Sequence, residues 1–241
     1  MPIFRAEGGK LAPFNQSEIL SQILLDGPEV YFRFDEPSGL VAIDHSGFGR
    51  HGTYNNDVQL GKPAISSTER SAYNPQLSFS YPAYIRSDGY GNITRKQDFS
   101  AVALVKISDA TTKGAFFNIG SDANVISVGK GNEGNMLSAG TTLAANAAYQ
   151  AYINPNVVLN NGLNLIGLSA RARDNFLNFY VNGVCVFSVA QVFNPPLGVG
   201  SVGFVAANNA VCLCDFGEFS FFTTELPANR FAAYWKAVQL N

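Results

Sequence analysis

Two acidic residues near the C-terminus are the first candidates for acid–base chemistry. Asp215 and Glu218 lie three residues apart in a segment rich in β-forming residues. A retaining glycoside hydrolase needs two carboxyl groups about 5.5 Å apart, which on a strand requires acids two or four residues apart on one face. The three-residue spacing predicts opposite faces. We therefore expect no catalytic residues and no enzyme, with a glycoside hydrolase kept as a remote alternative.

Aromatic residues offer a second kind of chemistry, the stacking of rings on sugars. One polar, glycine-containing stretch holds Tyr73, Tyr81, Tyr84 and Tyr90. Exposed tyrosines provide apolar contact area at a low cost in conformational entropy. Tyr84 and Tyr90 are therefore candidate ligand-binding residues, together with Asn178 and Tyr180, which share one face of a later strand. Packing in the core or in loops is the open alternative.

Composition limits the class of protein. Apolar residues make up 46% and charged residues 14% of the 241 residues, and the net charge is −2. An average soluble domain has roughly 25% charged residues. A chain this long and this apolar can build one large core. The small net charge predicts that the chain has no nucleic-acid partner. The sequence contains no run of roughly 20 apolar residues, so we expect no membrane span.

The few charges are unevenly spread. No Asp, Glu, Lys or Arg occurs from Gly134 to Ala170, or from Val184 to Cys214. One interpretation is that these segments are strands buried on both faces. The other is that part of this uncharged surface is covered by a neighbouring subunit, since charge is depleted at the centre of interfaces.

The N-terminal residues and the cysteines bear on the compartment in which the chain folds. The opening residues, Met1 to Arg5, contain no apolar run, so we expect no secretory signal. The cysteines are Cys185, Cys212 and Cys214. Cys212 and Cys214 would share one strand face, which is poor geometry for a disulfide. We expect three buried thiols and folding in a reducing compartment.

Strands dominate the pattern, with a helix near each end. Residues 17–25 are amphipathic and predict a short helix, and residues 227–238 predict a closing helix that covers the edge of the fold. Phe99 to Ile107 is dense in β-forming residues and predicts a central strand buried on both sides. Asn182-Gly183 separates two alternating runs and predicts a hairpin with a type I′ turn.

These features resemble laminin-G-like, concanavalin A-like domains. Residues 23–39 are similar to the family's opening strand, residues 44–54 to its Asp/Ser/Gly-rich loop, and residues 177–184 to its strand, Asn-Gly, strand signature. The resemblance extends over roughly residues 20–236. It implies an all-β fold, a concanavalin A-like (laminin-G-like) antiparallel β-sandwich jelly roll with short N- and C-terminal helices.

The chain departs from that family at its polar positions. Asn164 to Gly167 stand where many relatives carry a Trp-His pair, and Gly217-Glu218 stand where many carry Asp-Glu. Calcium is common in the family and needs several oxygen ligands. Asp44, Asp215 and Glu218 are the candidates to bind it. The alternative is that no cofactor binds, that Asp44 organises an Asx turn and that Glu218 is solvated.

The first residues lie outside the resemblance. Residues 1–16 have no hydrophobic period and contain Gly8-Gly9 and Pro13. We expect an extended N-terminal assembly arm ahead of a laminin-G-like domain at 17–241. Its candidate anchors are Ile3, Phe4, Leu11 and Phe14. An arm folded back on its own domain is the alternative.

Two functions therefore compete. The resemblance implies a non-enzymatic phage virion surface component, such as a capsid decoration or a tail- or fibre-associated protein, assembled in the host cytoplasm. Its partners would be other virion proteins or copies of itself, and it would also contact host glycans. The alternative is a glycan-binding, lectin-like module or adhesin that binds a cell-surface glycan, with calcium as its cofactor if one is needed.

Overall fold

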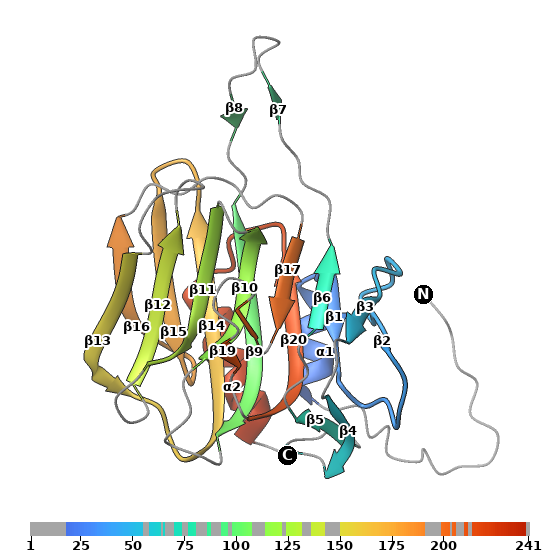
Figure 1. Ribbon diagram of the computed structural model, residues 1–241. Coiled ribbons are helices and arrows are strands. Elements are labelled where there is room, and N and C mark those ends of the chain that lie inside the picture. The colour runs from blue at the N-terminus through green and yellow to red at the C-terminus, as the bar shows by residue number, and fades with distance from the viewer. Residues whose placement is uncertain are drawn as a thin grey trace, which may run out of the picture.

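The fold is seen in a computed structural model of the chain (Figure 1). It describes residues 18–54, 58–63, 65, 70–73, 77–80, 86–87, 93–95, 98–107, 114–121, 124–131, 136–142, 150–190, 199–202, 204–205, 210–211 and 214–239. The predicted arm at 1–16, with Ile3, Phe4, Leu11 and Phe14, lies outside these ranges.

Two antiparallel sheets and two helices make up the described part. Sheet A follows the order β16 (Val184–Ala190), β15 (Phe176–Val181), β14 (Gly162–Arg171), β9 (Phe99–Ile107), β20 (Asp215–Phe222), β5 (Arg70–Tyr73) and β4 (Gln59–Pro63), and β1 (Val30–Phe32) also pairs with β20. Sheet B follows the order β13 (Gln150–Val158), β12 (Met136–Thr142), β11 (Asn124–Lys130), β10 (Gly114–Ser121), β17 (Val199–Val202), β6 (Leu77–Ser80), β3 (Gly52–Tyr54) and β2 (Val41–Ala42).

Smaller elements complete the description. The strands β18 (Phe204–Val205) and β19 (Ala210–Val211) join sheet B, and β7 (Arg86–Ser87) pairs with β8 (Ile93–Arg95). The helices are α1 (Glu18–Leu25) and α2 (Ala228–Gln239). Neither of these described helices is long and apolar enough to cross a membrane.

The main core lies between the two sheets. Strand alternation directs every second side chain inward, and these inward positions are rich in phenylalanine. Phe32 stacks near Phe219 with ring centroids 6.4 Å apart, and Phe117 of the opposite sheet lies 5.7 Å from Phe219. All three side chains are fully buried. The sandwich is an all-β jelly roll, as the sequence predicted.

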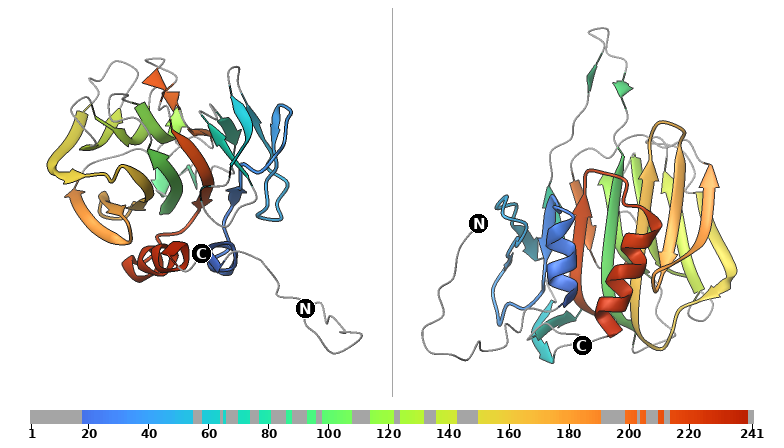
Figure 2. Two further views of the ribbon diagram at one scale, coloured as in Figure 1. Left: turned by 90° about the horizontal axis from the view of Figure 1, so that it is seen from below. Right: turned by 180° about the vertical axis from the view of Figure 1, so that it is seen from behind.

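A second apolar layer lies on the outer face of sheet A. Both helices pack on this face (Figure 2). Tyr31, Val102, Leu165 and Tyr180 turn outward from the sheet, and together with Phe231 of α2 they belong to one buried cluster. The strand β9 is consequently buried on both faces, as predicted, because its alternate residues enter both layers.

Polar contacts hold the two helices together. Asp26, directly after α1, accepts a 2.7 Å hydrogen bond from Nε of Arg230 and a short hydrogen bond from the Tyr234 hydroxyl. Nη2 of Arg230 also donates to the carbonyl oxygen of Gln22 at 3.1 Å. These contacts link segments more than 200 residues apart in the chain. They fix both helices over one sheet face.

The predicted hairpin is confirmed. Asn182 and Gly183 have φ of 51° and 79°, which is the positive φ that a type I′ turn requires at both positions. The Asn182 side-chain oxygen accepts a 2.8 Å hydrogen bond from the Leu165 amide. The turn is thereby tied to the neighbouring strand as well as to its own hairpin.

The predicted closing helix α2 lies on the outer face of sheet A, next to the edge strand β16, because Phe231 and Tyr234 pack against the apolar outer surface of the sheet. Residues 215–222 form the single strand β20 through Gly217. A β-bulge accommodates the glycine, so the strand continues.

Gly167 is required for the docking of α2. A Cβ atom at this position would lie 2.5 Å from Cδ1 of Phe231, whose ring stacks on Tyr180 with centroids 3.9 Å apart. We predict that Gly167→Ala lowers the free energy of unfolding by about 1–3 kcal/mol, the usual cost of overpacking a core. Urea denaturation measures it. In a Phe231→Leu background the cost should shrink, and an unchanged cost would contradict the steric explanation.

Candidate functional site

The outer face of sheet A is not completely covered by the helices. In the strand register, Ser100, Ser169, Asn178 and Ser188 are direct cross-strand neighbours on β9, β14, β15 and β16. We call these four residues the polar row. Ser100 and Ser169 are buried, Asn178 is half-buried, and Ser188 is exposed. The row therefore runs from the interior to the free edge of the sheet.

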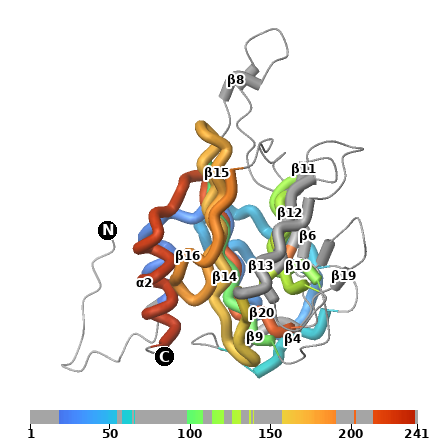
Figure 3. Tube along the Cα trace, turned by 90° about the vertical axis from the view of Figure 1, so that its left-hand side faces the viewer, coloured from blue at the N-terminus to red at the C-terminus, as the bar shows by residue number. Residues whose placement is uncertain are grey.

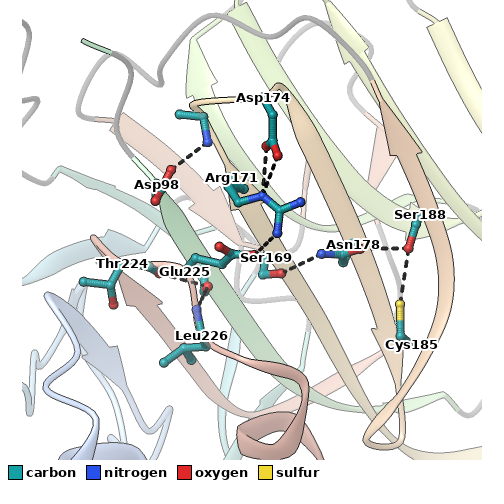
Figure 4. A network of polar contacts seen from close by, with 12 residues as sticks. Asp98, Ser169, Arg171, Asp174, Asn178, Cys185, Ser188, Thr224, Glu225 and Leu226 are labelled. Carbon is teal, nitrogen blue, oxygen red and sulfur yellow. Dashed lines mark hydrogen bonds and ion pairs between the residues drawn. The ribbon is translucent and has the colours of Figure 1, made fainter.

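Hydrogen bonds order the row (Figure 4). The Ser188 hydroxyl donates to Oδ1 of Asn178 at 2.8 Å, and Nδ2 of Asn178 donates to the Ser169 hydroxyl at 3.4 Å. At the inner end, Ser100 receives a 2.8 Å hydrogen bond from the amide of Leu226. This contact fixes the segment that leads into α2, so that Ser100 is covered while Asn178 and Ser188 at the outer end of the row stay accessible.

A charged border lies next to the row. Nε of Arg171 donates to both carboxylate oxygens of Asp174 at 2.9 Å, and Nη1 of Arg171 lies 3.5 Å from Oε1 of Glu225. The Arg171 guanidinium also lies 5.3 Å from the centre of the Phe176 ring. Hydrogen bonding to Arg171 lowers the pKa of Asp174 below its ordinary value. The border therefore presents ionised groups and one aromatic ring at neutral pH.

This arrangement can recognise hydroxyl groups. A carboxamide has two donor hydrogens and an acceptor oxygen with two lone pairs, and the contacts above use one donor hydrogen and one lone pair of Asn178. The remaining donor and acceptor positions sit on a half-exposed strand surface. A few fixed polar groups beside apolar area are typical of small-molecule sites.

The ligand-binding residues predicted from the sequence have different positions. Asn178 lies in the polar row. Tyr180 is only 4% exposed and is stacked under Phe231 of α2, so the prediction that its ring meets a ligand is wrong. The helix covers it because the outward side of β15 turns apolar at this point. Tyr84 and Tyr90 lie outside the described residues.

Asp44 organises a turn, which was one of the two alternatives for it. Its Oδ1 accepts hydrogen bonds from the amides of Tyr31 at 2.9 Å and Ser46 at 3.0 Å, and its Oδ2 accepts from the Ser46 hydroxyl at 2.7 Å and the Arg50 amide at 2.8 Å. Burial alone would raise the pKa of Asp44, but these hydrogen bonds lower it below its ordinary value. Both carboxylate oxygens are already used.

Glu218 and Asp215 share one face, which corrects the expectation from their spacing. Asp215 lies opposite Lys106 and Glu218 opposite Leu104, and those partners are two residues apart on β9. Gly217 is the additional residue of a bulge, so the strand alternation shifts by one position. A glycine suits this bulge, because a Cβ atom there would lie 2.9 Å from Cγ1 of Ile65.

Glu218 is also not solvated, contrary to the alternative stated for it. The residue is 2% exposed, and its carboxyl group lies close to the buried Tyr31 hydroxyl, but no described residue makes a well-formed hydrogen bond to it. Burial raises the pKa of Glu218 from 4.5 to about 8. The group is therefore largely protonated at neutral pH. Its burial also denies a substrate access to the Asp215–Glu218 pair.

The three predicted calcium ligands do not form a shared site. Within the described ranges, no group of three or more His, Cys, Asp or Glu residues could hold a metal ion. Both carboxylate oxygens of Asp44 accept hydrogen bonds within the turn, and Glu218 is buried and largely neutral. Asp44, Asp215 and Glu218 are thus not supported as a metal centre.

The cysteine prediction is partly wrong. Cys214 is fully buried, as predicted, but Cys185 is exposed. Cys185 lies 3.5 Å from the Ser188 hydroxyl, at the end of the polar row. It is exposed because β16 is the last strand of sheet A. Cys212 lies outside the described residues.

Sequence reasoning identified only Asn178 in the polar row and missed its serines. The row arises from the register of four strands, and the serines are separated by up to 88 positions in the chain. A usable signal was a single polar residue among the apolar residues of a strand, such as Ser169 in β14. The register that aligns these residues depends on which strands pair, and no single segment of the sequence determines it.

Comparison with known proteins supports the fold. No protein-family model matches the sequence, and no curated protein matches it significantly. Among solved structures, the botulinum neurotoxin serotype D ligand binding domain in complex with N-acetylneuraminic acid superimposes with a TM-score of 0.64 at 12% identity, covering 91% of this chain and 52% of that one. The botulinum neurotoxin type G receptor binding domain gives 0.61 at 13% identity, with 87% and 51% covered.

A third neighbour comes from a structure titled for the cell entry of botulinum neurotoxin type C, dependent upon interaction with two ganglioside molecules. It gives a TM-score of 0.59 at 13% identity and covers 91% of this chain and 53% of that one. This chain spans about half the length of each neighbour. At such identities the likeness shows a shared β-sandwich fold.

We predict that Glu218 makes the stability of the protein depend on pH. Its pKa is raised in the folded state, so the folded protein holds a proton that the unfolded chain loses above about pH 4.5. Stability should therefore fall as the pH rises from about 4.5 to 8, by up to about 1.4 kcal/mol per pH unit. Glu218→Gln should flatten this dependence in urea titrations. A variant that keeps the slope would contradict the assignment.

We predict the opposite sign for Asp44. Its pKa is lowered in the folded state, so its contribution is present at neutral pH and disappears as the pH falls through that lowered pKa. At pH 7, Asp44→Asn should cost about 1–3 kcal/mol, because an amide nitrogen would face buried donors. Asp174→Asn, at an exposed ion pair, is the matched control and should cost much less, because solvent screens an exposed pair. Equal losses would refute the proposed role of Asp44.

Proposed function

We propose that the chain is a non-catalytic binding module that recognises a glycan on the exposed part of the polar row. The observation that carries this proposal is the alignment of Asn178 and Ser188 at the uncovered end of the row. Their partly used amide and hydroxyl groups lie on a rigid sheet. Rigid positioning favours binding, because little conformational entropy is lost when the ligand arrives.

The charges at the border of the polar row favour a neutral glycan over an acidic one. Asp174 and Glu225 surround Arg171, and Asp98 accepts a 2.7 Å hydrogen bond from the Ala172 amide nearby. The described charges thus give no net positive field, which an acidic sugar would need. A neutral sugar, held through its hydroxyl groups with Phe176 at its side, fits this surface better than a sialylated one.

The structural neighbours agree with a binding role in general. Their titles name a ligand binding domain with N-acetylneuraminic acid, a receptor binding domain and ganglioside interaction. The match covers about half of each neighbour, so the location of those ligands is not transferred. The expectation that this chain is no enzyme is part of the proposal, and the burial of Glu218 supports it.

We predict that Asn178→Ala weakens glycan binding at least tenfold, which corresponds to about 1.4 kcal/mol and to the loss of one or two hydrogen bonds. A glycan array of neutral and sialylated sugars selects the ligand, and calorimetry measures the affinity. Asn160→Ala is the matched control, since Asn160 is exposed near the far end of β14. Equal affinity in both variants, or no binding to any sugar on the array, would overturn the proposal.

A structural role in an assembly is the second candidate, in its finer form the virion surface component that the sequence resemblance implied. The observation in its favour is a set of exposed apolar side chains. Leu40, Val41 and Ile43 are 64%, 52% and 46% exposed, and Phe48 is 58% exposed. Exposed apolar patches often mark contacts with other proteins. Co-purification with a particle in stoichiometric, repeated copies would favour this role.

A further inference from the structure

The four ends of the two sheets are protected to different degrees. An exposed edge strand presents unpaired backbone groups, and proteins usually block it with charge, proline or a very short strand. The edge strand β4 contains Lys62 and Pro63, and β13 contains Pro155 and an irregular register. The edge strand β2 is two residues long. Three of the four ends thus carry one of these protections.

The fourth end, β16, carries only a β-bulge as protection. Its sequence VCVFSVA contains no charged residue and no proline, and no described strand pairs with its outer side. Val184 is 63% exposed, and Cys185, Ser188 and Ala190 are also exposed. A bulge lies at Val186, between the partners of Phe179 and Tyr180, and leaves Phe187 to Ala190 in regular register. Figure 3 looks onto this side of the molecule.

The burial of β16 also decides between the two interpretations of the uncharged segment that begins at Val184. If this segment were uncharged because it is buried within its own domain, its first strand should be covered. Instead, four of its seven residues are exposed. The strand β14, two places away in sheet A and part of the other uncharged segment, is buried over residues 164–170. Coverage by a neighbouring subunit therefore remains the explanation for β16.

We propose that β16 pairs antiparallel with β16 of a second copy of this chain, joining two copies of sheet A into one continuous sheet. An antiparallel pair of identical strands is related by a two-fold axis, so each strand satisfies the other's backbone groups by symmetry. Because the two strands are identical, charges of one sign on both of them would meet across the seam and repel. A strand of seven uncharged residues avoids this repulsion without a complementary partner.

The proposed interface is small, so we expect the dimer to be weak. One pair of short strands buries less than the roughly 1,200 Å² of a standard stable interface. We therefore expect a dissociation constant on the order of 10 µM, with monomers in dilute solution. The pairing would also bring the exposed ends of two polar rows, at Ser188, to the same seam. This inference concerns the association of copies and stands whether or not a glycan binds.

A charge exchange tests the proposal. Val184→Lys with Ala190→Lys, and Val184→Glu with Ala190→Glu, change exposed positions and should leave each monomer folded, as circular dichroism can verify. By sedimentation velocity at about 100 µM, ten times the expected dissociation constant, the wild type should be largely dimeric and each variant monomeric. Their equimolar mixture should form a heterodimer. Val41→Lys, on a different exposed strand, is the control and should dimerise like the wild type.

Three outcomes would overturn the proposal: a wild type that stays monomeric, variants that still dimerise alone, or a mixture that stays monomeric. The exposed thiol of Cys185 gives an independent measurement on the unmodified protein. Its labelling by a maleimide, mapped by mass spectrometry, should slow about threefold or more between 1 µM and 100 µM protein as the edge becomes covered. A labelling rate that does not depend on concentration would contradict the pairing.

Discussion

The contact between the two helices and the outer face of sheet A is the constraint on which the other features depend. A sheet face lined by Val102, Leu165 and Tyr180 has to be covered, because exposing it would lose the favourable burial of apolar surface. The contacts of Asp26 with Arg230 and Tyr234 hold both helices in place. Where the helices end, the face becomes polar and open to solvent.

Polar groups differ in their properties according to whether they are buried or lie on the open part of the sheet. Glu218 lies on the outer face in a buried setting without a well-formed hydrogen bond from a described residue, so its carboxyl group is largely neutral at pH 7. Asp44 is also buried but accepts four hydrogen bonds, so it stays charged. Asn178, beyond the helix, keeps hydrogen-bonding capacity and access to solvent. Burial and hydrogen bonding, more than residue type, therefore determine the role of each group. Glu218 stays protonated, Asp44 orders a turn and Asn178 remains accessible to a ligand.

The proposed site and the proposed interface lie beside each other for a physical reason. The polar row crosses the sheet toward β16, beyond the part of β15 that α2 covers at Tyr180. A weakly binding surface at such an edge would gain from pairing, since two sites on one rigid sheet can engage a repeated ligand together. A structural role in a larger assembly would use the exposed apolar side chains around Leu40, which leave this edge available. Both functions are therefore compatible with one architecture.

The sequence by itself determined the elements with a strong local signal. Asn182-Gly183 predicted its hairpin because only certain residues accept positive φ at both positions, and the apolar density of Phe99 to Ile107 predicted a strand buried on both sides. Only the tertiary structure decided the site. The bulge at Gly217 reversed the facing of Glu218, the helix α2 covered Tyr180, and the register of four strands aligned Ser169 with Asn178 and Ser188. These outcomes depend on pairing between distant segments, and a local pattern holds no information about which strands become neighbours.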